Sequence, residues 1–167
     1  MLVNGALSGT SSVSVSSGAT LGGTGSIANG VNVASGATLS PGASIESLQL
    51  GSVDLDGSLL IEWDTTVSPN IDLLNIANSL NLGSNSSVTF ANLGSGTLDL
   101  NTPYIFITYG SGGLTGTFNA VNNLPVGYIL DYNYGGLNQI AVVPESSSLL
   151  LTFIFSLPLL SRRRRSH

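Results

Sequence analysis

Val13-Ser-Val-Ser-Ser-Gly-Ala-Thr-Leu21 is followed further along the chain by a second copy, Val31-Asn-Val-Ala-Ser-Gly-Ala-Thr-Leu39. When the alignment is extended to Ile27 and Ile45, the two copies agree at nine of fifteen positions. Within each copy apolar residues alternate with small polar residues, which is typical of strands that bury one face. The Ser-Gly pair between the alternating runs predicts a turn, because glycine readily adopts a positive φ. The repeat therefore predicts an all-β protein in which similar strands lie next to one another.

The same alternation continues along the chain with a longer and less regular spacing. Its apolar positions are Ile45, Leu48, Leu50, Val53, Leu55, Leu59, Ile61, Trp63, Leu74, Ile76, Leu80, Leu82, Val88, Phe90, Leu98 and Leu100. Repeats of roughly 18 to about 25 residues favour a parallel β-helix (solenoid), in which each repeat stacks its apolar face on the next. A β-sandwich is the alternative, because short strands with frequent turns also form one.

Composition and charge exclude several classes of protein. The 167 residues include 21 glycines without a three-residue period, which excludes collagen, and only 8% of them are charged. Residues 1–161 contain all nine acids and no Lys or Arg, so nucleic-acid binding is not expected. There is no cysteine, and the one histidine is the last residue, His167. We therefore expect no catalytic Ser-His or Cys-His pair, no metal site and no cofactor.

Two features of the body suggest alternative functions. Asp54, Asp56, Glu62 and Asp64 are expected to point outward from two adjacent strands, where they could form the acidic pair of a polysaccharide-active enzyme or a weak Ca²⁺ site. A solvated outer face is the favoured interpretation. All five tyrosines lie in residues 104–143, where they could bind carbohydrate: Tyr104, Tyr109, Tyr128, Tyr132 and Tyr134. We expect them instead to form the core of a C-terminal β cap.

The C-terminal segment has a different composition. Pro144, Glu145 and Ser146 precede an apolar run made of Leu149, Leu150, Leu151, Phe153, Ile154, Phe155, Leu157, Leu159 and Leu160. Arg162, Arg163, Arg164 and Arg165 follow this run. Residues 146–161 would span about 24 Å as a helix, slightly less than the hydrocarbon core of a bilayer. A short transmembrane helix with a cytoplasmic arginine stop is expected, and a buried apolar helix is the alternative.

This order of a Pro-Glu motif, an apolar run and a terminal arginine cluster resembles the PEP-CTERM protein-sorting domain of Gram-negative bacteria. Pro144 and Glu145 match the motif, whereas Ser146 stands where the family usually has a second proline. The resemblance covers residues 143–167. It implies recognition by an exosortase-like membrane protease, a transient stay in the inner membrane, and transfer to the cell envelope or extracellular matrix.

The body has a resemblance of its own. Ser-Gly-Ala-Thr-Leu-Gly-Gly-Thr-Gly-Ser-Ile27 and Ser-Gly-Ala-Thr-Leu-Ser-Pro-Gly42 resemble the autotransporter-associated β-strand repeat. That resemblance covers residues 1–100 and implies a right-handed β-helix without a catalytic constellation. Because the first residues lack the apolar run of an export signal, we expect that an N-terminal portion precedes them.

The sequence thus predicts three parts: solenoid repeats over 1–103, a C-terminal β cap over 104–143 and a sorting tail over 144–167. The favoured function is that of a non-catalytic exported surface or matrix protein, with exopolysaccharide as a possible partner. A carbohydrate-binding module and a polysaccharide-active enzyme are the alternatives.

Overall fold

The computed structural model describes residues 1–9, 11–68 and 70–145 of the chain. In these residues the protein is all-β, with one short 3₁₀ turn, η1 (Tyr134–Gly136). None of the elements described there is an apolar helix long enough to cross a membrane. The predicted transmembrane helix falls in residues 146–161, outside the described part of the chain.

Fifteen strands follow one another along the described residues. They are β1 (Ala6–Leu7), β2 (Val13–Val15), β3 (Thr20–Gly23), β4 (Ser26–Val33), β5 (Thr38–Pro41), β6 (Ser47–Leu55), β7 (Ser58–Trp63), β8 (Leu73–Ile76), β9 (Ser79–Leu82), β10 (Ser87–Asn92), β11 (Tyr104–Thr108), β12 (Gly113–Thr115), β13 (Ala120–Asn122), β14 (Tyr128–Asp131) and β15 (Gln139–Pro144).

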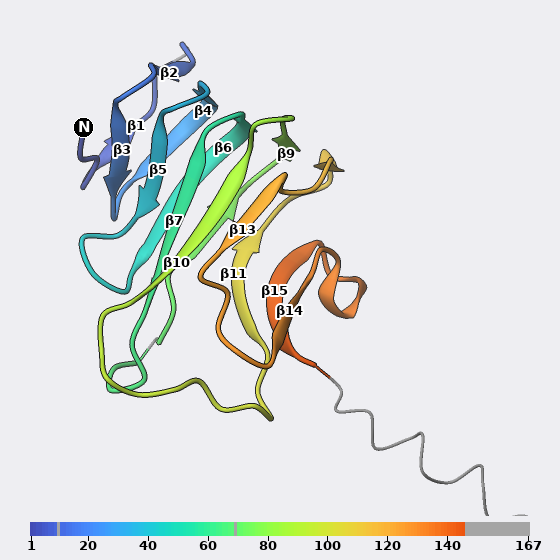
Figure 1. Ribbon diagram of the computed structural model, residues 1–167. Helices are drawn as coiled ribbons and strands as arrows, with labels where there is room; N and C mark the ends of the chain where they lie inside the picture. The colour runs from blue at the N-terminus through green and yellow to red at the C-terminus, as the bar shows by residue number, and fades with distance from the viewer. Residues whose placement is uncertain (10, 69, 146–167) are drawn as a thin grey trace, which may run out of the picture.

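These strands form two sheets that face each other (Figure 1). The larger sheet has the order β1-β4-β6-β8-β11-β15-β14, with β2 beside β4, β9 beside β6 and β12 beside β9. The smaller sheet has the order β3-β5-β7-β10-β13. The chain passes through the larger sheet, crosses to the smaller one and returns, and we call each such passage a round. Successive rounds lie side by side from the N-terminal to the C-terminal end.

The repeat identified in the sequence sets the pairing of the first rounds. Val13 pairs with Val31 and Leu21 with Leu39, both in parallel strands and both at the offset that the repeat predicts. The Ser-Gly turns are also confirmed, because Gly18 and Gly36 have φ values of 79° and 78°. The extension of the repeat to Ile45 is wrong, since Ile27 pairs with Leu50. Ile45 lies in the segment between β5 and β6, where the second copy departs from the first.

Later rounds are longer than the repeat spacing predicts. Leu59 pairs with Val88, and Leu80 pairs with Leu114, so the partners are further apart in sequence than Val13 and Val31 are. The added length includes two loops at one end of the strands, residues 64–72 and 93–103 (Figure 1). A loop outside the sheets lengthens a round without changing how its strands stack.

The apolar side chains of the rounds form one hydrophobic cluster between the sheets. One column in the larger sheet consists of Val15, Val33, Leu55 and Leu82, which pair in that order and are all buried. The smaller sheet contributes Leu21, Leu39, Leu59 and Val88 in the same way. The alternation therefore predicted the buried face correctly at these positions. Leu100 is an exception, because it is 55% exposed in the loop before β11.

The C-terminal end departs from the parallel arrangement. Strands β11, β12 and β13 still pair in parallel with β8, β9 and β10, so the sheets continue without a break past residue 103. Only β15 and β14 are antiparallel among the described strands, β15 to β11 and β14 to β15. Their reversed direction ends the larger sheet with a hairpin.

Candidate functional site

The four acids of the predicted outer patch do not come together. Asp54 and Asp56 lie in or directly after β6 in the larger sheet, whereas Glu62 and Asp64 lie in or directly after β7 in the smaller sheet. The predicted facing is correct, since Val53, Leu55 and Trp63 are buried. The predicted grouping is wrong, because consecutive strands of this fold lie in different sheets. Among the described residues, no group of three or more acids or histidines is arranged to hold a metal ion.

Two of these acids accept hydrogen bonds from turn residues instead. Asp56 accepts bonds from the side-chain amide (2.9 Å) and the backbone N–H (3.0 Å) of Asn85, and these bonds lower its pKa. Asp64 accepts bonds from the backbone N–H (2.8 Å) and the hydroxyl (2.7 Å) of Thr66, which lower the pKa of Asp64. A general acid needs a raised pKa, so these shifts run against that role. Lowered pKa values are expected of acids that accept hydrogen bonds from turn residues.

Asp54 belongs to an outward-facing column of polar side chains. It pairs with Asn32 on one side and with Asn81 on the other, and the amide of Asn81 donates to its carboxylate at 3.2 Å. A second column contains Gln49, Asn75 and Thr108, in which the Thr108 hydroxyl donates to the Asn75 side chain at 2.8 Å. The outer face of the larger sheet therefore presents amide and hydroxyl groups.

The tyrosines of the predicted cap hold backbone segments together. Tyr104, Tyr109 and Tyr128 are buried. The Tyr109 hydroxyl donates to the Tyr132 carbonyl at 2.9 Å, and the Tyr132 hydroxyl accepts the Phe118 N–H at 3.1 Å. Burial, helped by the nearby Tyr104 and Asp99, raises the pKa of Tyr128 to about 12. The core prediction is therefore confirmed for Tyr104, Tyr109 and Tyr128, and Tyr132 packs against this core while half-buried. It is wrong for Tyr134, which is half-buried in η1 and lies outside the core cluster.

One pair of aromatic side chains does border a pocket. Trp63 and Tyr128 line a pocket of about 400 Å³ together with the exposed Leu100 and Val126. Its lining also includes the polar residues Asn92 and Thr97. The Asn92 side chain is already engaged, since it donates to the Gly96 carbonyl and accepts from the Gly94 N–H. This pocket offers apolar contact and few free hydrogen-bonding groups.

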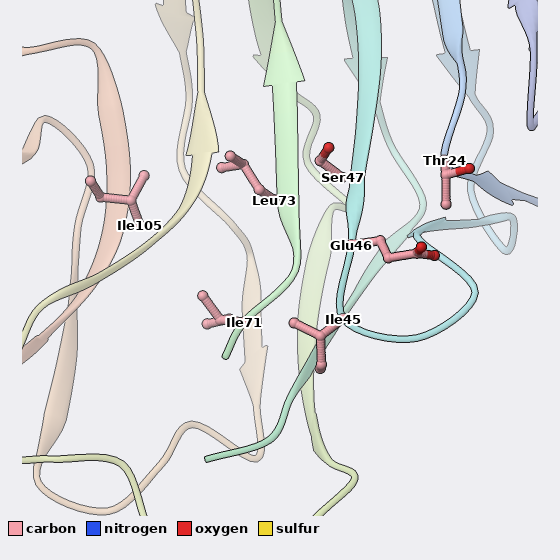
Figure 2. A pocket seen from close by; sticks show the side chains of 7 residues that line it. All are labelled: Thr24, Ile45, Glu46, Ser47, Ile71, Leu73 and Ile105. Carbon is pink, nitrogen blue, oxygen red and sulfur yellow. The ribbon is translucent and has the colours of Figure 1, made fainter. Parts of the chain in front are cut away.

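A second hollow lies on the larger sheet (Figure 2). It has a volume of about 460 Å³ and is lined by Thr24, Ile45, Glu46, Ser47, Ile71, Leu73 and Ile105. Its side chains come from the segments before β4, β6 and β8 and from the starts of β6, β8 and β11. The hollow is mostly apolar, with the Glu46 carboxylate as the charged group in its lining.

The sequence predicted no role for Asp72. Its side chain is fully buried and is bonded to Glu46, one of the residues that line this hollow. Its carboxylate accepts the backbone N–H of Glu46 at 3.0 Å and that of Glu62 at 2.8 Å. Burial raises the pKa of Asp72 from 3.8 to about 7, against the two N–H bonds, which lower it. The carboxylates of Glu62 and Glu46 raise it further. The flanking apolar residues Ile71 and Leu73 do not signal this burial, because Asp54 also stands between apolar residues and is exposed.

The start of the predicted sorting tail belongs to the folded body. Pro144 is the last residue of β15 and pairs with Tyr128, and the Glu145 N–H donates to the Gly127 carbonyl at 2.8 Å. Glu145 itself is exposed. Ser146, the apolar run from Leu149 to Leu160 and the arginines 162–165 lie outside the described residues. The Pro144-Glu145 pair therefore lies at the end of β15, next to the edge strand β14.

Comparison with known proteins adds no assignment to this geometry: no protein-family model matches the chain, and no curated protein sequence is significantly similar to it.

Proposed function

We propose that the chain is a non-catalytic, exported bacterial surface or extracellular-matrix protein, built as a right-handed parallel β-helix and targeted by a C-terminal sorting signal. The body serves as a scaffold, and the tail holds it in the inner membrane until an exosortase-like protease releases it. Exopolysaccharide is the proposed neighbour of the delivered protein.

The order of residues after β15 carries this proposal. A Pro-Glu pair, an apolar run and four consecutive arginines follow one another at the end of the last strand. An apolar run of this length with a basic end is suited to a membrane, with its arginines on the cytoplasmic side. That orientation leaves the β body on the outer side.

The β-helix assignment is supported by the pairing of the rounds. Parallel strands recur through both sheets, with a register shift between β4 and β6, and buried apolar residues pair with buried apolar residues along the stack. Parallel pairing without helical crossovers is typical of stacked coils, in which each round contacts only its neighbours. The handedness of the coil is part of the proposal.

The chemistry of the outer surface supports a scaffold function. The described body has no Lys, Arg or His side chain, Asp64 caps its own turn, and Asp56 caps the turn at Asn85 in the next round. Amide and hydroxyl columns without cations suit contact with neutral, hydrated polymers better than with anions.

The experiment follows the C-terminus during export. The chain, placed behind a cleavable export signal, is expressed with and without an exosortase-like protease, and its location and intact mass are measured. We expect membrane retention without the protease, and loss of the tail with release when the protease is present.

The matched variants are Glu145→Gln in the motif and Asp54→Asn on the outer face. Each removes one exposed negative charge, and only the first should block processing. Intact chain dissolved in the cytosol, or equal processing of the two variants, would contradict the proposal.

A further inference from the structure

Asp72 is a buried acid that has no cation to balance it within the described residues. Its side chain is fully buried, and residues 1–161 contain no Lys, Arg or His. In place of an ion pair, it has the backbone N–H groups of Glu46 and Glu62. A buried carboxylate without a cation is costly when ionised, so its protonation state affects the stability of its surroundings.

The two hydrogen bonds to the Asp72 carboxylate join three separate segments, and we call the place where these segments meet the corner. The Glu46 N–H belongs to the segment between β5 and β6, and the Glu62 N–H belongs to β7 in the other sheet. Asp72 itself ends the hairpin that returns from β7, where its own N–H donates to the Glu62 carbonyl at 2.9 Å. The next N–H, that of Leu73, donates to the Glu46 carbonyl at 2.9 Å.

The carboxyl group is shielded from solvent, and Gly42 lies beside it. A Cβ atom at Gly42 would lie only 3.3 Å from Oδ1 of Asp72. The apolar Ile71 and Leu73, its chain neighbours, form part of the hollow beside Glu46 (Figure 2). Water therefore replaces these contacts only if the segment before β6 moves away.

The charged groups acting on Asp72 are both negative. Glu46 lies on the segment before β6, and Glu62 lies on β7. Strand β8 carries no titratable residue, and β11, its neighbour in the sheet, carries only Tyr104. Ionisation of Asp72 thus adds a third negative charge at this corner, and residues 1–161 contain no Lys, Arg or His side chain to offset it.

We propose that Asp72 is a pH-sensitive latch: its protonated carboxyl group holds the segment before β6 against β7 and the hairpin, and loss of the proton loosens this corner and opens the hollow.

The direction follows from proton linkage. Burial gives Asp72 a pKa of about 7 in the closed corner, against 3.8 when the carboxyl group is in water. The closed form therefore keeps a proton that the open form loses between these two values. The free energy that favours the closed corner is greatest below about pH 4, falls as the pH rises, and changes no further above about pH 7. The opening equilibrium changes by up to roughly tenfold per pH unit in this range.

Amide hydrogen exchange of the whole chain tests the latch. The Glu46 and Glu62 amides are compared at pH 5 and pH 7, after division by their intrinsic exchange rates. We expect their protection to fall about 50-fold over this range. The Asp56 amide, which donates to the Val33 carbonyl at the other end of β6, should show no such fall.

Two variants distinguish the latch from a merely structural carboxyl group. Asp72→Asn keeps the size of the side chain and removes its titration, so the difference in protection between pH 5 and pH 7 should disappear. The double variant Glu46→Gln and Glu62→Gln removes the two neighbouring charges that disfavour the ionised form in the closed corner, so protection should fall less between pH 5 and pH 7 than in the parent chain.

Carbon NMR of the Asp72 carboxyl group keeps the proposal testable if the Asn variant does not fold. Titration near pH 7 supports the latch, whereas titration near pH 4 overturns it. An equal loss of protection in the parent chain and in Asp72→Asn would also overturn it.

Discussion

Two aspartates with the same local sequence pattern have opposite environments. Asp54 stands between Val53 and Leu55, and Asp72 stands between Ile71 and Leu73. Asp54 is expected to point outward and is exposed, whereas Asp72, for which no orientation was predicted, is fully buried. Asp72 precedes its strand and bonds to two other segments, so its position depends on contacts far apart in sequence. Local pattern does not contain that information.

Glycine at position 51 has a steric role that alternation does not show. A Cβ atom there would overlap the Ala28 carbonyl oxygen of the neighbouring strand. We expect Gly51→Ala to lower the free energy of unfolding by about 1–3 kcal/mol, because backbone must move to make room. Urea unfolding measures the loss. Gly30→Ala is the control, since its nearest atom is the Ser12 Cβ at 3.9 Å, and an equal loss there would refute the steric explanation.

At the scale of strands, the sequence predicted pairing only where the rounds are alike. The copies beginning at Val13 and Val31 pair in the predicted register because their turns have the same length and the same glycine conformation. Later rounds carry loops of different length at residues 64–72 and 93–103, so a fixed offset no longer aligns their strands. Apolar alternation still identified the buried face of each strand, because successive side chains of a strand point to opposite faces of the sheet whatever the loop length.

The strand columns also predict which side chains stabilise the stack. Leu55 lies between Val33 and Leu82 in the larger sheet and is 1% exposed. We expect Leu55→Ala to lower the free energy of unfolding by about 2–5 kcal/mol, because it leaves a cavity between three rounds. Gln49→Ala, in an exposed position of the same strand, should change it by about 0.5 kcal/mol or less. Similar losses for both variants in urea unfolding would contradict the assignment of the inner face.

At the scale of the whole molecule, the two ends of the stack differ. Strands β1, β2 and β3 form the edges at the N-terminal end, whereas β15 and β14 cover the C-terminal end of the larger sheet. The sequence indicated a change of character near Tyr104, where aromatic residues become frequent. It did not show that parallel pairing continues to β13, because short strands such as β12 and β13 carry little apolar pattern.

The antiparallel closure predicts which truncation the fold tolerates. Ile140, Ala141 and Val142 of β15 are fully buried, and β15 covers the edge of β11. A chain ending at Glu145 keeps these contacts and the Glu145–Gly127 bond, so its melting temperature should equal that of the full chain. A chain ending at residue 124 exposes the β11 edge and the apolar Phe106, and should aggregate or melt lower. Circular dichroism melts and sedimentation compare the two, and equal stability would show that β14 and β15 do not close the fold.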